Sequence, residues 1–300
     1  MKKSFFIFVV VAVFVVEAWW VRERLGGSEG RHLVPDSIAG SLEEFQITST
    51  DATVSVRKID GRWVVASLSD YPAAENTVLG FLQALNDASV VAKPSTGDVD
   101  VFKDAVEVRL TAADHRMVLR LGAMSEGAVP GRFVQVDDGP VVLCDTFFDG
   151  YSADPLAWIE RRLAPGLDPD RVVRVTVLST RAEFTMSVAD DGYRLSGDLE
   201  TPSVNRNKGR QWLDALSRVE VSGIVPPDVS DEAAGIAGPE LVTVTTDDGR
   251  MREFLIGEPL TNQTRSVRIR GDGRPEEAWR YVISEAAVNA ILPYEKDLRR

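Results

Sequence analysis

The chain has 300 residues, of which 44% are hydrophobic, and its formal net charge at pH 7 is −12. This length and apolar content suffice for one large core or for two domains of ordinary size. The acidic balance, without any basic run, excludes a nucleic-acid-binding face, which needs clustered Lys and Arg. A single cysteine excludes an intrachain disulfide and a cysteine-based zinc cluster.

The first 21 residues predict a membrane anchor. Lys2 and Lys3 precede a long apolar run, and two tryptophans follow it at the place where an interfacial aromatic belt is expected. We expect a single retained span with the N-terminus inside and the bulk of the chain outside the cytoplasm; a cleaved signal peptide is the alternative. The anchor residues are Phe5, Phe6, Ile7, Phe8, Val9, Val10, Val13, Phe14, Val15, Val16, Trp19 and Trp20.

Residues 22–42 follow as a predicted flexible stalk. They contain the run Gly-Gly-Ser-Glu-Gly at 26–30, together with Pro35 and Gly40, and they lack apolar periodicity.

The remainder of the chain repeats one pattern. Residues 59–91 align with 190–225, and residues 105–123 align with 240–258. Both copies have an Asp-Gly turn and a later strand that ends in Leu-Gly or Ile-Gly. The sequence therefore predicts two α+β domains, at residues 43–165 and 166–300.

Each predicted domain contains short alternating strands and one main helix. The helix of the first copy carries Val78, Leu79, Leu82 and Leu85 at helical spacing, and that of the second carries Trp212, Leu213 and Leu216. A further helix is expected from Asp154 to Leu163. The predicted fold class is α+β: an N-terminal transmembrane helix, then two tandem repeats of antiparallel strands with one main helix each.

The sequence offers little chemistry. Its Asp-Gly pairs fall where hairpins must turn, so we interpret them as turns rather than acid pairs. His32 and His115 have no companions at metal-ligand spacing, and Cys144 has no neighbouring base, which predicts an inert, half-buried thiol. We expect no catalytic residue, no cofactor and no metal site.

The aromatic residues allow two interpretations. They recur at apolar positions of strands and helices, which favours core packing, and they could also line a ligand or partner surface between the repeats. The candidates for that surface are Trp63, Tyr71, Tyr151, Trp212 and Trp279.

An apolar N-terminal segment, the stretch "DGRWVVASLSDYPAAENTVLGFLQAL" and the later stretch "DEAAGIAGPELVTVTTDDGRMREFLIGEP" together resemble a bacterial membrane-anchored family of unknown function, number 4340 in its series. The resemblance covers residues 43–293 in two copies. It implies an inner-membrane protein, often encoded beside ABC-2-type or gliding-motility transporter subunits, and it attaches no catalytic residue. The first copy departs from the pattern where "DVDVFKDAVEV" replaces the Gly-x-x-x-Pro approach.

Three functions follow as hypotheses. The first is a non-enzymatic, membrane-tethered extracytoplasmic module, an accessory or scaffold subunit of an ABC-2-type transporter, in the bacterial inner membrane. The alternative is a cell-envelope module that binds a sugar or peptide in an aromatic cleft between the repeats. A hydrolase with an unrecognised site comes last.

Overall fold

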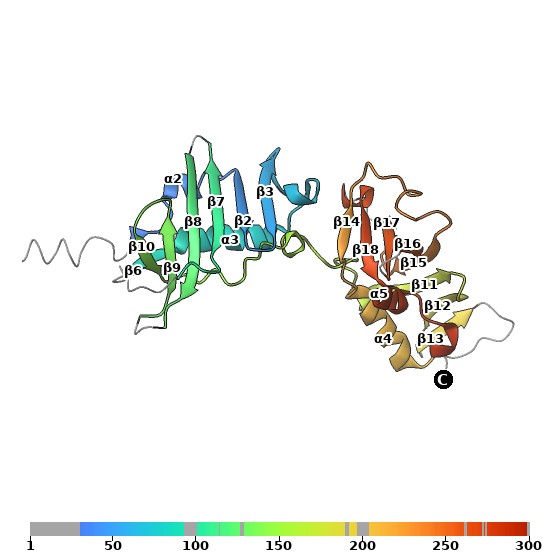
Figure 1. Ribbon diagram of the computed structural model, residues 1–300. Helices are drawn as coiled ribbons and strands as arrows, with labels where there is room; N and C mark the ends of the chain where they lie inside the picture. Colours follow the sequence, from blue (N-terminus) through green and yellow to red (C-terminus); the bar gives the residue numbers. More distant parts are fainter. Residues whose placement is uncertain are drawn as a thin grey trace, which may run out of the picture. The chain divides into compact units, whose positions relative to one another are not determined.

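The computed structural model describes residues 31–92, 101–113, 115–126, 129–189, 192–196, 204–260, 263–271, 273 and 275–298. The chain divides into two compact units, Met1–Trp158 and Ile159–Arg300 (Figure 1). Each unit has its own sheet and its own long helix, and the two are described separately.

The first unit contains a sheet of ten strands, in which neighbouring strands are antiparallel and follow the order β1-β6-β10-β9-β8-β7-β2-β3-β4-β5. The strands are β1 (Arg31–His32), β2 (Glu44–Thr48), β3 (Thr53–Ile59), β4 (Arg62–Val65), β5 (Tyr71–Pro72), β6 (Ser89–Ala92), β7 (Val106–Ala112), β8 (His115–Met124), β9 (Arg132–Val136) and β10 (Val141–Cys144). The helical elements are α2 (Asp36–Ala39), η1 (Ala66–Leu68), α3 (Glu75–Asp87) and η2 (Pro155–Trp158).

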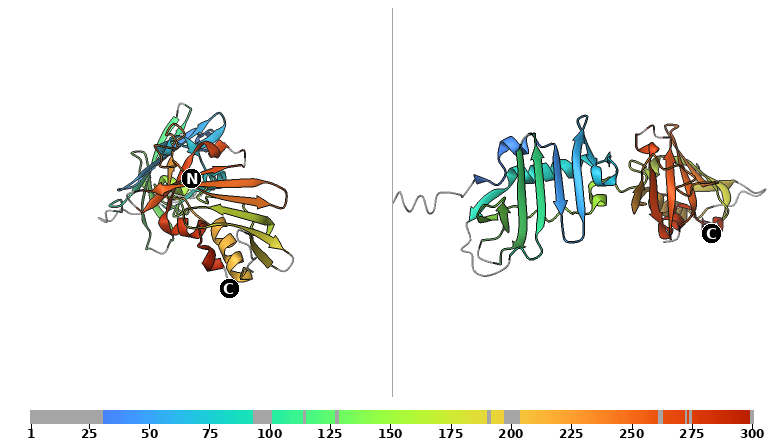
Figure 2. Two further views of the ribbon diagram at one scale, coloured as in Figure 1. Left: turned by 90° about the vertical axis from the view of Figure 1, so that its right-hand side faces the viewer. Right: turned by 45° about the horizontal axis from the view of Figure 1, so that its top comes forward.

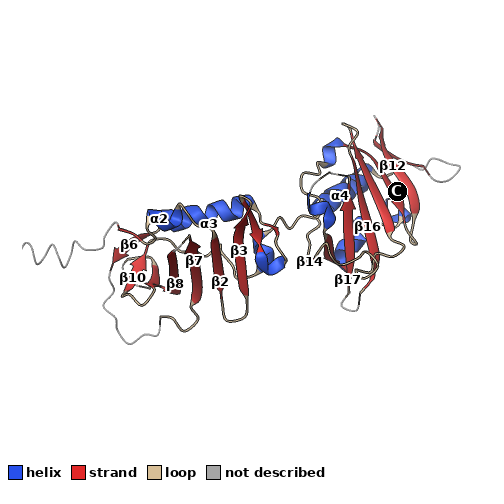
Figure 3. Cartoon of the chain, turned by 90° about the horizontal axis from the view of Figure 1, so that it is seen from above, coloured by secondary structure: helices blue, strands red, loops and turns tan. Residues whose placement is uncertain are grey.

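The core of the first unit lies between this sheet and α3. Because successive side chains of a strand point to opposite faces, Phe45 and Ile47 of β2 and Val108 and Leu110 of β7 all reach the same face, where they are buried. Helix α3 lies along that face (Figure 3), and in the right-hand view of Figure 2 it passes behind the strands. The α3 side chains buried there are Val78, Phe81 and Leu85.

The second unit contains a sheet of eight strands, in which neighbouring strands are antiparallel and follow the order β13-β12-β11-β15-β16-β17-β18-β14. The strands are β11 (Val172–Leu178), β12 (Glu183–Ala189), β13 (Gly192–Ser196), β14 (Gly223–Val225), β15 (Glu240–Thr246), β16 (Met251–Pro259), β17 (Thr264–Arg270) and β18 (Arg280–Ser284). The helical elements are η3 (Pro169–Arg171), α4 (Arg206–Ser217), η4 (Pro275–Ala278), α5 (Glu285–Ile291) and α6 (Glu295–Leu298).

Helix α4 covers one face of the second sheet. The prediction that Trp212, Leu213 and Leu216 form its apolar face is confirmed, since all three are buried. Asn205 caps the N-terminus of this helix: its side chain accepts hydrogen bonds from the amides of residues 207 and 208 and so satisfies two free donors of the first turn.

The two sheets share one strand order. Strands β2–β4, helix α3 and strands β6–β10 occupy the same successive positions as β11–β13, α4 and β14–β18. Both units also begin in the same way, because the amide of Leu33 donates to Ala88 and the amide of Leu163 donates to Val219, each at 2.7 Å. Each unit therefore starts with a short segment that hydrogen-bonds to the residues that follow its long helix.

The predicted fold class is wrong because it overestimates the share of helix in the structure. The described residues form two large antiparallel sheets, and each unit has only one helix longer than seven residues. The helix expected from Asp154 to Leu163 shrinks to the single turn η2, because the chain then extends to pair beside Glu220. The predicted transmembrane helix, residues 1–21, lies outside the described residues; within them, none of the helices has the length and apolar character needed to cross a membrane.

Residues 31–42 differ from the predicted flexible stalk. They form β1 and α2, and Leu33, Val34, Ile38 and Leu42 are buried in the first unit. The apolar residues of this segment are too irregularly spaced to show helical or strand periodicity, which is why composition alone suggested a linker.

Candidate functional site

The five aromatic residues proposed for a ligand surface contribute to the packing of their own units. Tyr71, Trp212 and Trp279 are buried, and Trp63 and Tyr151 are half-buried. The Tyr151 ring stacks on Trp158 and the Trp63 ring packs against Phe45. The predicted anchor residues, Phe5 to Trp20, lie outside the described residues.

The first sheet has a second face that α3 does not cover. Strands β2, β3, β7 and β8 present polar side chains there, alternating with the buried apolar ones. Two rows of side chains run across β2, β7 and β8 on this face. One row consists of Glu44, Thr111 and Arg116, and the other of Gln46, Arg109 and Val118. We call this surface the outer face of the first unit.

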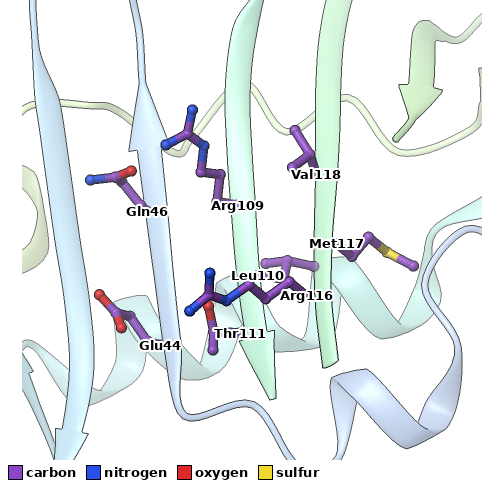
Figure 4. Close-up of a pocket in the computed structure, with 8 residues that line it drawn as sticks. All are labelled: Glu44, Gln46, Arg109, Leu110, Thr111, Arg116, Met117 and Val118. Carbon is purple, nitrogen blue, oxygen red and sulfur yellow. The ribbon is translucent and has the colours of Figure 1, made fainter. Parts of the chain in front are cut away.

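A shallow pocket of about 200 Å³ lies on the outer face. Figure 4 shows its side chains, which come from the three neighbouring strands β2, β7 and β8. The residues that line it are Glu44, Gln46, Arg109, Leu110, Thr111, Arg116, Met117 and Val118.

Two of the three charged side chains in this pocket have partners among the described residues. The Arg109 guanidinium pairs with Glu107 at 2.6 Å, and the Glu44 carboxylate accepts a hydrogen bond from the Ser55 hydroxyl at 3.0 Å. Arg116 is exposed and has no ion pair in the described part of the chain. A guanidinium without a carboxylate partner is available to an anionic group of a ligand.

The outer-face residues were not predicted from the sequence. Their signal was present in "EFQIT" and "VEVRLTA", where every second residue is polar. That alternation says which residues share a face. It does not say that the polar face is left uncovered, because this depends on where the helices pack.

A second pocket, of about 260 Å³, lies at one end of the second sheet. Two arginines that line it pair with acids: Arg171 binds both Asp247 and Asp248, and Arg250 also approaches Asp248. A hydrogen bond from the Thr246 hydroxyl outweighs the effect of burial and, with help from these arginines, lowers the pKa of Asp248 to about 2. Arg171 and Arg250 are therefore paired with acids at this end of the sheet.

Groups suited to catalysis are scarce in the described residues. They contain no group of three His, Cys, Asp or Glu side chains that could hold a metal ion. Burial raises the pKa of the Cys144 thiol, whose side chain is fully enclosed rather than half-buried. His32 is hydrogen-bonded to the Asn86 carbonyl, and His115 begins β8 on the surface.

Two antiparallel sheets, each with a long helix on one face, and a polar outer face on the first of them define a β-rich protein of two similarly built units. A comparison with protein families matches residues 63–237 to the domain of unknown function DUF4340, and the chain belongs to this family. The matched stretch runs from β4 in the first unit to the segment that follows β14 in the second. Searches among curated proteins and among solved structures found no match.

Proposed function

We propose that this protein is a membrane-tethered, extracytoplasmic interaction module without catalytic activity of its own, an accessory subunit of an ABC-2-type transporter. Its N-terminal apolar segment would hold it at the bacterial cytoplasmic membrane, and both units would lie on the outer side. A tether raises the effective concentration of a binding surface beside membrane partners, so even a weak contact becomes productive.

The observation that carries the proposal is the outer face of the first unit. A broad polar sheet face with an exposed, unpaired Arg116 beside Arg109 suits recognition of a partner's surface better than enclosure of a small substrate. The pocket is shallow and adjoins exposed side chains, which also favours a macromolecular contact.

We also propose that the two units are copies of one domain. Their common strand order and the equivalent edge pairing of Leu33 and Leu163 support this. Residues 31–158 and 161–298, produced separately, should then each unfold cooperatively in urea. Failure of both fragments to fold would contradict the proposal, because each copy of a duplicated domain should contain its own complete core.

The function is tested by purifying the full-length chain from native membranes in mild detergent and identifying co-purifying proteins by mass spectrometry. The wild type should retain its N-terminal segment and bring down transporter subunits. The double variant Arg109→Glu/Arg116→Glu should lose them, because it reverses both positive charges of the pocket.

Arg250→Glu is the matched control, since it reverses an exposed arginine in the other unit and should leave capture unchanged. A mature chain that begins after residue 18, or a wild type without membrane partners, would overturn the tether and the accessory role. If Arg250→Glu lost the transporter subunits as fully as the double variant, the outer face would not be the contact surface.

A further inference from the structure

A segment of the second unit crosses the sheet face opposite α4. We call residues 226–238, which follow β14, the strap. Ala234 and Ile236 of the strap pack against Leu255 of β16, and all three are buried. Leu255 points away from the core residue Phe254, because neighbouring residues of a strand face opposite sides. The strap therefore covers part of the outer face of the second unit.

Beneath the strap, three arginines surround one carboxylate. Arg268 of β17 and Arg280 of β18 are direct cross-strand partners, and Arg270 is two residues further along β17. One oxygen of the strap residue Asp231 accepts from Arg280 and the other accepts from Arg268, both at 2.7 Å. The Arg270 guanidinium lies 3.8 Å from the same carboxylate.

Three arginines on one carboxylate exceed the number at two other ion-pair clusters of the described residues. Glu285 binds two arginines, Arg181 and Arg265, and Asp248 also binds two, Arg171 and Arg250. Two like charges placed directly opposite each other on adjacent strands destabilise a sheet unless an acid lies between them. Asp231 supplies one negative charge and Glu253, the cross-strand partner of Arg270 on β16, supplies a second, so the three arginines leave the cluster with one excess positive charge in a chain of net charge −12.

The arginines also keep hydrogen-bonding capacity that Asp231 does not use. The Nε–H of Arg268 is buried and has no acceptor among the described residues. The Arg270 side chain is 46% exposed, and its guanidinium approaches Asp231 no closer than 3.8 Å. Arg280, in contrast, is only 8% exposed and is held in place by the carbonyls of Pro227 and Ala278.

The geometry is that of a preorganised receptor for carboxylates. Planar guanidinium groups bind carboxylates through paired charge-assisted hydrogen bonds, and fixing them beforehand reduces the entropy lost on binding. Burial acts to raise the pKa of Asp231, but hydrogen bonds from Arg280 and Arg268 outweigh it, so the pKa lies below its usual range. Asp231 is therefore an ionised occupant of the receptor.

We propose that Arg268, Arg270 and Arg280 form a binding site for the acidic side chains of a protein partner, and that Asp231 occupies it within the chain until that partner competes. This site lies on the second unit, so the inference goes beyond the proposed contact on the first. It does not depend on the tether.

The test uses full-length protein in detergent and poly-L-glutamate as the probe, with poly-L-lysine to show the sign of the charge that binds. Asp231→Asn removes the internal competitor and should bind poly-L-glutamate about tenfold more tightly than the wild type, the value of one charge-assisted hydrogen bond. Glu232→Gln is the matched control. It makes the same charge change at the next strap residue, which is exposed, and should leave the affinity near that of the wild type.

A second variant keeps the proposal testable if Asp231→Asn unfolds. Arg270→Gln changes an exposed side chain that contacts Asp231 only at 3.8 Å, so it should fold normally and bind poly-L-glutamate several-fold more weakly than the wild type. Equal affinities of Asp231→Asn and Glu232→Gln would overturn the site in favour of long-range charge alone. If Arg270→Gln bound poly-L-glutamate as tightly as the wild type, the cluster would be an internal ion pair that holds the strap and not a binding site.

Discussion

The carbonyl oxygen of Gly235 lies directly against the position that a Cβ atom on Gly257 would occupy. The next amide along the strand, that of Glu258, donates a hydrogen bond to this same carbonyl at 2.9 Å. The strap thus contacts β16 at a point where the strand has no side chain. The first unit repeats the arrangement, with the Val101 carbonyl against Gly122 and bonded to the Ala123 amide at 2.7 Å.

Gly257→Ala should therefore destabilise the second unit. The added methyl group meets backbone atoms that cannot rotate away, so the strap must shift and lose its contact with β16, at a cost of about 1–3 kcal/mol. Urea unfolding measures the loss. Gly150→Ala is the control, because no atom lies within 4 Å of its added Cβ and its backbone is not in the left-handed region. Equal stability of the two variants would mean that the strap adjusts without cost.

Arg265→Met should cost much more stability than the same change at an exposed arginine. Arg265 is only 8% exposed and binds Glu240, itself 11% exposed, and Glu285. Without Arg265, Glu240 keeps only its hydrogen bonds from Thr180 and Glu285 keeps Arg181. Removing one member of a buried ion pair costs about 3–5 kcal/mol. Arg57→Met is the comparison, because both side chains of its pair with Asp70 are exposed and solvent screens such pairs, so the loss should be small. Denaturant midpoints that fall equally would contradict this ranking.

Stability should fall on acidification, and Asp248 should account for a measurable part. Its pKa is lowered from 3.8 to about 2, mainly by the Thr246 hydroxyl. A group with a depressed folded-state pKa stabilises the protein above its unfolded pKa, and this contribution is lost as the pH falls through the folded value. Asp248→Asn should therefore flatten the decline between about pH 4 and pH 2.

The measurement for Asp248 is the urea midpoint across that range, for the wild type and the variant. Asp51→Asn, an exposed turn acid of the first unit, is the matched control and should keep the wild-type slope. A variant with an undiminished slope would assign the acid sensitivity to other carboxylates with lowered pKa values, such as Asp231 and Glu285, where hydrogen bonds from neighbouring arginines favour the charged form.

The local elements could be predicted from the sequence because their signals are local. The Asp60-Gly61 turn has positive φ at both residues, as the dipeptide predicts, and both long helices exist where apolar spacing placed them. The buried side of α3 was less well predicted. Leu79 was expected on its apolar face and is exposed, whereas Phe81 is buried. Helical spacing gives the period of a pattern, but the sheet decides which side of the helix is covered.

The charge clusters could not be predicted, because they join residues distant in sequence. Asp231 meets Arg268 and Arg280 only because the strap crosses strands that the chain forms later. The recurrent Leu-Gly and Ile-Gly strand ends were visible in the sequence, and they now have a physical reason. Gly122 and Gly257 leave room for a crossing backbone, which no local propensity expresses.

The last prediction concerns the edge segment that was expected to be a flexible stalk. Leu33 is 5% exposed and its amide donates to Ala88, so Leu33→Ala should cost about 2–5 kcal/mol through the lost apolar contact and the cavity left behind. Leu79→Ala removes the same atoms from a side chain that is 51% exposed and should change the unfolding free energy by less than about 0.5 kcal/mol. If residues 31–42 were an unpacked stalk, Leu33→Ala would change the unfolding free energy as little as Leu79→Ala. A large difference between their urea midpoints would instead place the start of the first folded unit at Arg31, only ten residues beyond the end of the predicted anchor at residue 21.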